Sequence, residues 1–164
     1  MRIFLKYTLF VSMLVWGSLQ TASGQGTEPS TGSETSPSTA SQGTKILITT
    51  GSNHLVAMMD DNPTARDFVS MLPLTVTLRD FSPAEKVSDG LSKRLSKYGA
   101  PASGMGMTGD IAYYSPWGNL AFYRGQGPDA AGVIKIAKII SGIEILNQSG
   151  TVRATITLSE KSDE

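Results

Sequence analysis

Residues 61–75 read DNPTARDFVSMLPLT and contain the clearest structural signals in this chain of 164 residues. Asn62 is a favourable N-cap, and Pro63 takes the first helical position, where its missing N–H costs nothing. The apolar residues that follow repeat at helical spacing: Ala65, Phe68, Val69 and Leu72. Pro73 ends the helix. The pattern predicts a helix over residues 62–72 that buries one stripe against the strands on either side.

The segments around this helix predict strands with one apolar face. Residues 45–50 and 54–59 are apolar runs joined by Gly51-Ser52-Asn53, which is typical of a hairpin. Residues 74–79 alternate apolar and polar side chains, and Phe81 can extend this strand. Further strands are predicted at 110–114, 119–123, 133–139 and 151–158. Such strands, about seven in all, must stack in two sheets or close into a barrel.

Three other segments complete the expected organisation. Residues 82–109 are rich in Gly, Ser and Lys and predict a long excursion, with a short helix around 91–95. We interpret 133–139 as a strictly alternating strand with Lys135 and Lys138 on the solvent side. Residues 141–147 predict a turn or a second short helix.

At three places the sequence resembles the cyclophilin-like family of small bacterial domains, and more distantly the cyclophilins. Residues 61–75 are similar to the helix D-N-x-T-A-x-x-F-x-x-L-L-P of that family. Residues 109–114, GDIAYY, resemble its strand G-D-I-x-Y, and residues 138–143 are similar to its turn G-K-V-x-x-G. The resemblance implies a mainly β fold over residues 45–159: a closed, mostly antiparallel cyclophilin-like β-barrel with one or two short capping helices.

The departures from the cyclophilin pattern concern catalysis. A catalytic cyclophilin has an F-H-R triplet on its central strand and a Q-G-G-D string beyond it, and neither occurs here. The arginine of the triplet donates toward the prolyl nitrogen as the amide twists over a barrier of about 18 to 20 kcal/mol. The sequence therefore predicts a domain that binds a proline-containing peptide or a small ligand, with little or no isomerase activity. An active peptidyl-prolyl isomerase is the alternative, and a purely structural module, which would have no pocket, is a third option.

Candidate ligand-binding residues are Arg79, Phe81, Tyr114, Trp117, Phe122 and Tyr123. By order of elements, Arg79 lies on the strand that carries the arginine in cyclophilins, but it also fits as the solvent-facing member of an alternating strand. Arg124 is a second candidate for a displaced donor. The aromatic residues of 113–123 fit either a barrel core with a surface tyrosine or a shallow pocket on the barrel surface. Trp117 occupies a tight turn, where it can contact a ligand or fold back over the barrel end.

Residues 1–24 have the features of a secretory signal peptide. Arg2 and Lys6 precede an apolar run at 7–16, which is shorter than the roughly 20 residues of a membrane span. Small residues at 22–24 predict cleavage after Gly24, and a retained anchor is the alternative. Residues 25–44 predict a flexible Ser/Thr/Gly/Pro linker, and 160–164 a polar tail. We therefore expect a secreted or periplasmic protein that is not held at a membrane after cleavage.

Composition argues against several kinds of site. The chain has no cysteine, which excludes disulfides and thiol chemistry, and His54 is its only histidine. Zinc sites and catalytic triads therefore have few of the groups they need, and we expect no metal and no cofactor. Basic and acidic residues each number 14, and loss of Arg2 and Lys6 leaves the acidic residues in excess by two. This balance argues against a nucleic-acid partner.

Overall fold

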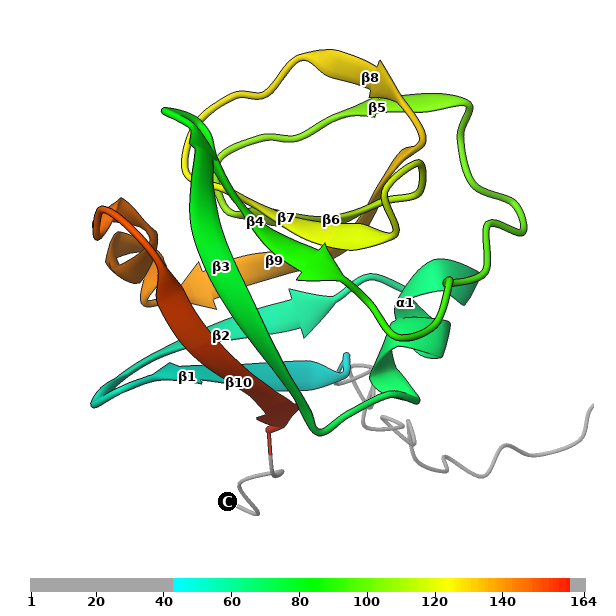
Figure 1. The fold of residues 1–164 in the computed structure, drawn as a ribbon. Coiled ribbons are helices and arrows are strands. Elements are labelled where there is room, and N and C mark those ends of the chain that lie inside the picture. The colour runs from blue at the N-terminus through cyan, green and yellow to red at the C-terminus, as the bar shows by residue number, and fades with distance from the viewer. Residues whose placement is uncertain (1–42, 160–164) are drawn as a thin grey trace, which may run out of the picture. The chain divides into compact units, whose positions relative to one another are not determined.

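Eight strands close into a barrel within residues 43–159, the part of the chain that this computed structural model describes. They are β1 (Lys45–Thr50), β2 (Asn53–Met59), β3 (Leu74–Ser82), β4 (Glu85–Gly90), β6 (Asp110–Tyr114), β7 (Asn119–Tyr123), β9 (Val133–Ser141) and β10 (Val152–Leu158). They pair antiparallel in the order β1-β10-β3-β4-β7-β6-β9-β2, and β2 pairs with β1 to complete the ring (Figure 1). The expected closed, mostly antiparallel barrel is confirmed.

Alternation along the strands fills the barrel interior. Outside the bulges, every second side chain points inward, and the apolar ones form one cluster. Its most deeply buried members from the strands include Ile48, Leu55, Leu78, Ile111, Tyr113, Leu120, Phe122, Ile136 and Ile156. Because the sheet closes on itself, the barrel has no unpaired edge strand.

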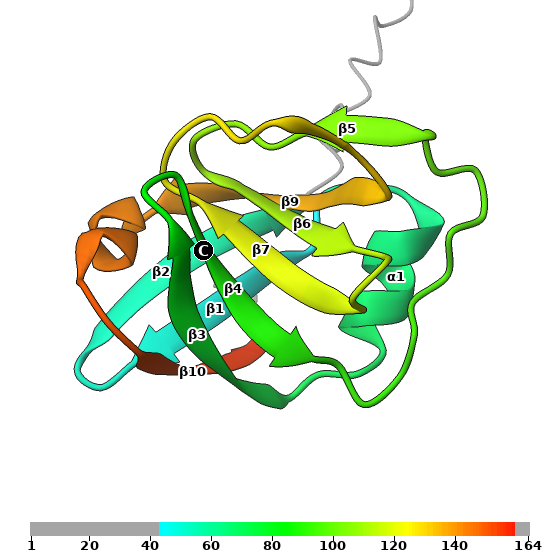
Figure 2. The ribbon, with the colours of Figure 1, turned by 45° about the horizontal axis from the view of Figure 1, so that its top comes forward.

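Helix α1 (Pro63–Val69) packs on this cluster through Phe68, which is fully buried, and Ala65. Asn62 caps the helix as predicted, since its Oδ1 accepts a hydrogen bond from the Ala65 N–H at 2.9 Å. The other end of the Asn62 amide donates to the Lys135 carbonyl at 3.0 Å, which ties the helix start to β9. The 3-10 helix η1 (Ile143–Asn147) lies well away from α1, beside the ends of β2 and β9 (Figure 2).

The sequence predicted that the helix ends at Leu72, but it ends at Val69. The Ser70 N–H still donates four residues back, to the Arg66 carbonyl, but the N–H groups of Met71 and Leu72 donate to carbonyls three residues back, at 3.0 and 3.2 Å. This tighter pattern is typical of a last turn that leaves the α-helix, and it still packs Leu72 against the core.

The prediction for residues 82–109 was wrong in two respects. Residues 85–90, EKVSDG, form strand β4 of the barrel, between β3 and β7, although only Val87 among them is a large apolar residue. No helix forms at 91–95; this segment is irregular, with a bend at Ser92 and Lys93. Leu95 is buried, and its N–H donates to the Tyr113 hydroxyl at 3.3 Å. Beyond it, β5 (Ser103–Met105) pairs with β8 (Asp129–Ala131) in a separate two-stranded ribbon.

Strand β9 does not alternate strictly. Its pairing with β6 shifts between Ile111 and Ala112, which face Ala137 and Lys135, so Ile136 is an extra residue. This bulge explains how Lys135 and Lys138, three positions apart, both remain on the outside while Ile136 and Ala137 are fully buried.

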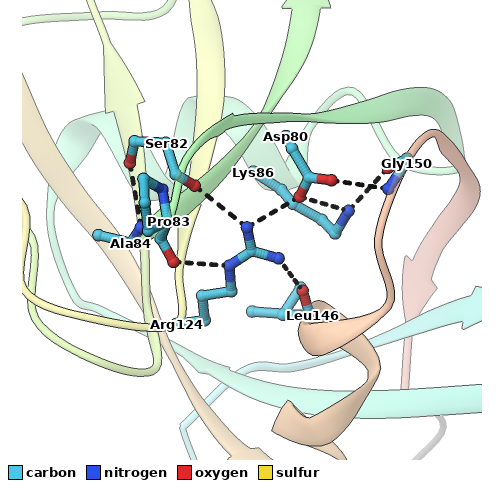
Figure 3. A network of polar contacts seen from close by, with 8 residues as sticks. All are labelled: Asp80, Ser82, Pro83, Ala84, Lys86, Arg124, Leu146 and Gly150. Carbon is cyan, nitrogen blue, oxygen red and sulfur yellow. Dashed lines mark hydrogen bonds and ion pairs between the residues drawn. The ribbon is translucent and has the colours of Figure 1, made fainter.

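A polar network fixes the turn between β3 and β4 to the end of the barrel (Figure 3). The Lys86 ammonium is almost completely buried and donates to Asp80 Oδ1 at 2.9 Å and to the Gly150 carbonyl at 2.8 Å. Arg124 pairs with the same carboxylate at 2.9 Å and donates to the carbonyls of Ser82, Pro83 and Leu146. The network therefore joins β3, β4, the end of β7, η1 and the segment before β10.

The predicted signal peptide (1–24), most of the predicted linker (25–44) and the polar tail (160–164) lie outside the described residues. Within residues 43–159, none of the helices has the length and apolar character that crossing a bilayer requires.

We expect Phe68→Ala to lower the free energy of unfolding by about 3 to 5 kcal/mol, because it removes the largest anchor of α1 from a closed core. Arg66→Ala, on the exposed side of the same helix, removes only a surface ion pair with Asp61 and should cost no more than about 1 kcal/mol. Urea unfolding of both variants measures the difference. Equal effects would contradict the packing described here.

Asp80→Asn should flatten the acid dependence of stability. The hydrogen bond from Lys86, and next that from the Gly150 N–H, lowers the pKa of Asp80 to about 2. The ionised carboxylate therefore stabilises the fold fully above its ordinary pKa of about 4, and this contribution is lost as the pH falls toward 2. Urea unfolding midpoints across this range should fall more steeply in the parent chain than in Asp80→Asn. Asp61→Asn, which removes an exposed carboxylate, controls for net charge and should follow the parent curve.

Candidate functional site

A second apolar cluster lies on the outside of the barrel. It consists of Val87, Ala112, Ala121, Tyr123 and Val133, all buried, with Tyr114 and Ala130 packed beside it. These residues are buried because the β5–β8 ribbon and its connections pass over the outer face of β6, β7 and β9 (Figure 2). Strand β7 is therefore buried on both faces, which explains its apolar and aromatic run from Leu120 to Tyr123.

Tyr123 is held under this cover by two glycines. A side chain at Gly106 would meet the Tyr123 ring at 2.2 Å, and one at Gly127 would meet it at 2.5 Å. The Gly127 N–H donates to the Gly106 carbonyl at 2.8 Å, so the two close approaches belong to one linked piece of backbone. The absence of a side chain at both positions lets the backbone lie against the ring.

Beside this cluster is an aromatic pocket of about 180 Å³. Its lining consists of Phe81, Glu85, Val87, Tyr114, Trp117, Asn119, Ala121, Tyr123, Pro128, Ala130 and Val133. Trp117, at the turn between β6 and β7, contacts Phe81 edge to face at a centroid distance of 5.5 Å and Tyr114 in the same manner at 5.3 Å. The rings of Phe81 and Trp117 are more than half exposed. They form the rim of the pocket, and Ala121 and Val87 lie at its buried base.

A bulge places Phe81 at this rim. In the pairing of β3 with β4, Asp80 faces Lys86 and Ser82 faces Glu85, so Phe81 is an extra residue without a partner. A bulge of this kind redirects a side chain while the ladder continues on both sides. The same turn that the polar network holds in place therefore presents Phe81 to Trp117.

A second hollow of about 270 Å³ adjoins the aromatic pocket. The two share four lining residues: Phe81, Val87, Trp117 and Asn119. Arg79 lines only the second hollow, where its guanidinium forms an ion pair with Asp89, and both side chains are more than half exposed. We call the two hollows together the outer groove; it runs over the outside of β3, β4 and β7.

Asn119 lines both hollows and is almost fully buried. Its Nδ2 donates to the Ser88 carbonyl at 3.1 Å, where a bulge in β4 interrupts the ladder to β7. Its Oδ1 is buried and has no hydrogen-bond partner among the described residues. A buried acceptor without a partner costs about 1 to 3 kcal/mol.

Glu85 introduces an acidic group into the aromatic pocket. It lies opposite Tyr123 in the β4–β7 ladder and is 8% exposed. Burial raises the pKa of the Glu85 carboxyl, and interactions with Tyr123 and Ser82 offset part of the rise. Burial, and next the neighbouring charge of Glu85, raises the pKa of the Tyr123 hydroxyl. The pocket is therefore apolar enough to disfavour an unpaired charge on either group.

The structure brings together most of the residues singled out from the sequence. Phe81, Tyr114, Trp117 and Tyr123 line the aromatic pocket, and Arg79 lines the adjoining hollow. Phe122 lies elsewhere: it is fully buried in the barrel interior opposite Ile111.

Arg124 also lies away from the groove. Its guanidinium is occupied by three backbone carbonyls and Asp80, so its position supports a role in holding the barrel end.

Sequence reasoning missed Glu85 and Asn119. Glu85 lies in a segment that the sequence predicts to be a long excursion. Asn119 begins a predicted strand, and nothing in the pattern distinguishes it from an ordinary strand residue. An acidic residue two positions after Pro83 gives no local sign that it is buried.

A larger hollow of about 420 Å³ lies between the β1–β2 turn and η1, beside His54 and Glu144. Most of its lining side chains are exposed, and no Phe, Tyr or Trp lines it. It lacks the buried, convergent polar groups that binding sites usually contain, so we place the candidate site in the outer groove.

Comparison with known proteins gives a family and a fold. The model of a family described as the cyclophilin-like family matches residues 48–157. The solution structure of a hypothetical protein from Archaeoglobus fulgidus is similar, with a TM-score of 0.54 and 16% identity over 71% of this chain and 95% of the other. At that identity the likeness concerns the fold. No curated protein matches the sequence.

Proposed function

The chain belongs to the cyclophilin-like family, and from this premise we propose that its outer groove binds an extended, proline-containing peptide without appreciable isomerase activity. The observation that carries the proposal is the aromatic pocket together with the adjoining hollow that shares its rim of Phe81 and Trp117. An apolar surface with a few convergent polar groups is the usual composition of a binding site. A small ligand that fills both hollows is the other occupant that this composition admits.

The size of the hollows favours a peptide. The aromatic pocket has about 180 Å³, which is less than the roughly 300 to 1,000 Å³ typical of pockets for drug-sized ligands. It suits one side chain, and the adjoining hollow of about 270 Å³ suits a neighbouring one. An extended peptide places alternate side chains on the same face, so it can occupy both hollows while its backbone crosses the Phe81–Trp117 contact.

The position of Arg79 explains why binding is proposed without catalysis. Its guanidinium is paired with Asp89 and exposed to solvent. Catalysis requires a donor that interacts more strongly with the twisted prolyl bond than with the planar one. A guanidinium that already has a carboxylate partner at the groove edge is poorly suited to that task. The signal-peptide features of residues 1–24 support a secreted or periplasmic setting for the bound peptide.

One observation favours an active isomerase as a second candidate. Arg79 lines the same hollow as Phe81 and Trp117, so a basic donor does lie beside an apolar surface of the barrel. If Arg79 leaves Asp89 when peptide binds, it can approach the prolyl nitrogen.

Peptide binding should quench or shift the fluorescence of Trp117. The chain has two tryptophans, so Trp16→Phe leaves Trp117 as the only one. In that background, titration with acetyl-Ala-Xaa-Pro-Ala-amide peptides should give saturable changes. Phe81→Ala should weaken binding roughly tenfold or more, because it removes an aromatic anchor at the rim. Tyr98→Ala, an aromatic residue that is 82% exposed and lines neither hollow, is the matched control and should leave affinity unchanged. A flat titration with every peptide would refute the proposal.

Isomerisation of the same peptides should remain at its uncatalysed rate. Exchange NMR on the X-Pro bond, with protein at a tenth of the peptide concentration, measures this directly. Catalysed exchange that Arg79→Ala abolishes would establish the second candidate and overturn the non-catalytic proposal. The Asp89→Asn variant is informative as well, since it frees Arg79 from its partner without removing the guanidinium.

A further inference from the structure

We propose that the aromatic pocket is selective for a cationic ammonium group, so that the peptide bound in the outer groove carries a lysine side chain there. This inference rests on the proposed function and specifies the chemistry of the residue that enters the pocket. It comes from the combination of four aromatic side chains with one buried carboxylate that lacks a cation.

The aromatic side chains are arranged as a partial cage. Phe81, Tyr114, Trp117 and Tyr123 come from four different places in the chain and line one small pocket. Trp117 contacts Phe81 and Tyr114 with interplanar angles of 80° and 79°, so the rings at the rim are nearly perpendicular to the tryptophan. Aromatic faces attract cations, tryptophan most strongly, and several faces around one site are the usual way in which proteins bind ammonium ligands.

Glu85 supplies the negative charge in this cage. None of the ion pairs within residues 43–159 includes Glu85. The basic residues nearest to it in the ladder and turn are committed elsewhere: Lys86 binds Asp80 and the Gly150 carbonyl, and Arg124 binds Asp80 and three other carbonyls. Arg79 in the adjoining hollow is paired with Asp89. Within the described residues, the buried Glu85 carboxylate therefore has no cationic partner.

The energetic argument follows from this burial. A carboxylate 8% exposed loses much of its hydration, and only Tyr123 and Ser82 offset the loss by hydrogen bonding. A ligand ammonium in the pocket would supply both a counter-charge and hydrogen-bond donors in surroundings of low dielectric constant, where such a pair interacts strongly. A neutral side chain of the same size can contact the aromatic faces of the pocket, but it leaves the Glu85 carboxylate unpaired. The pocket therefore discriminates between the two by charge.

The test uses two peptides that differ only in charge: acetyl-Ala-Lys-Pro-Ala-amide and the same peptide with norleucine in place of lysine. In the full chain with Trp16→Phe, Trp117 fluorescence reports binding of each. We expect the lysine peptide to bind at least tenfold more tightly. Glu85→Gln should remove that preference by weakening binding of the lysine peptide. Glu144→Gln removes an exposed carboxylate that lines neither hollow and should retain the preference. Asp89→Asn tests the carboxylate of the adjoining hollow.

The outcomes separate this inference from the proposed function. Equal binding of both peptides, or a preference for norleucine, overturns the ammonium selectivity and leaves the peptide-binding groove standing. Binding of neither peptide overturns both. A lysine preference that survives Glu85→Gln but disappears in Asp89→Asn assigns the selectivity to the other hollow and overturns the inference as well. Thermal unfolding of Glu85→Gln checks its fold, and the comparison of the two peptides on the parent chain decides the selectivity even if that variant fails to fold.

Discussion

Closure of the sheet between β1 and β10 is the constraint on which the rest of the structure depends. The first and last strands of the domain pair antiparallel from Ile46 with Leu158 to Thr49 with Thr155. Because this pairing joins the two ends of the domain, every other strand must fit into a ring of fixed length. Ring closure buries one face of each strand in a single core, and the opposite faces become the surface on which a site can form.

The outer groove follows from the way in which one part of that surface is covered. The β5–β8 ribbon shields the outside of β6 and β7, where Ala121 and Tyr123 become almost as buried as the core. At the margin of the ribbon the cover ends, and the exposed rings of Phe81 and Trp117 begin. The pocket is therefore a boundary between a covered and an uncovered part of the same sheet. Such a boundary joins buried polar groups, Glu85 and Asn119, to solvent-accessible aromatic side chains.

The sequence predicted those helices and strands that neighbouring residues determine by themselves. Asn62 and Pro63 define the start of α1 by capping chemistry, and the alternation of residues 74–79 is visible without knowledge of the partner strand. Strand β4 could not be predicted in this way, because Lys86 is buried only by virtue of Asp80 and Gly150, which are distant in sequence from one another. The inward and outward positions of Phe122 and Tyr123 likewise depend on the pairing register, since both are aromatic and both are buried.

The alternation of charge along β4 links the register of the barrel to the character of the groove. Glu85 faces outward with Tyr123, and the next residue, Lys86, faces the barrel end with Asp80. In a sheet, a slip of one residue moves every side chain of a strand to the opposite face. A slip of β4 would therefore place an ammonium among the aromatic rings and a carboxylate beside Asp80. The same pair of neighbouring residues thus makes misregistered barrels unstable and sets the sign of the charge that the surface presents to a ligand.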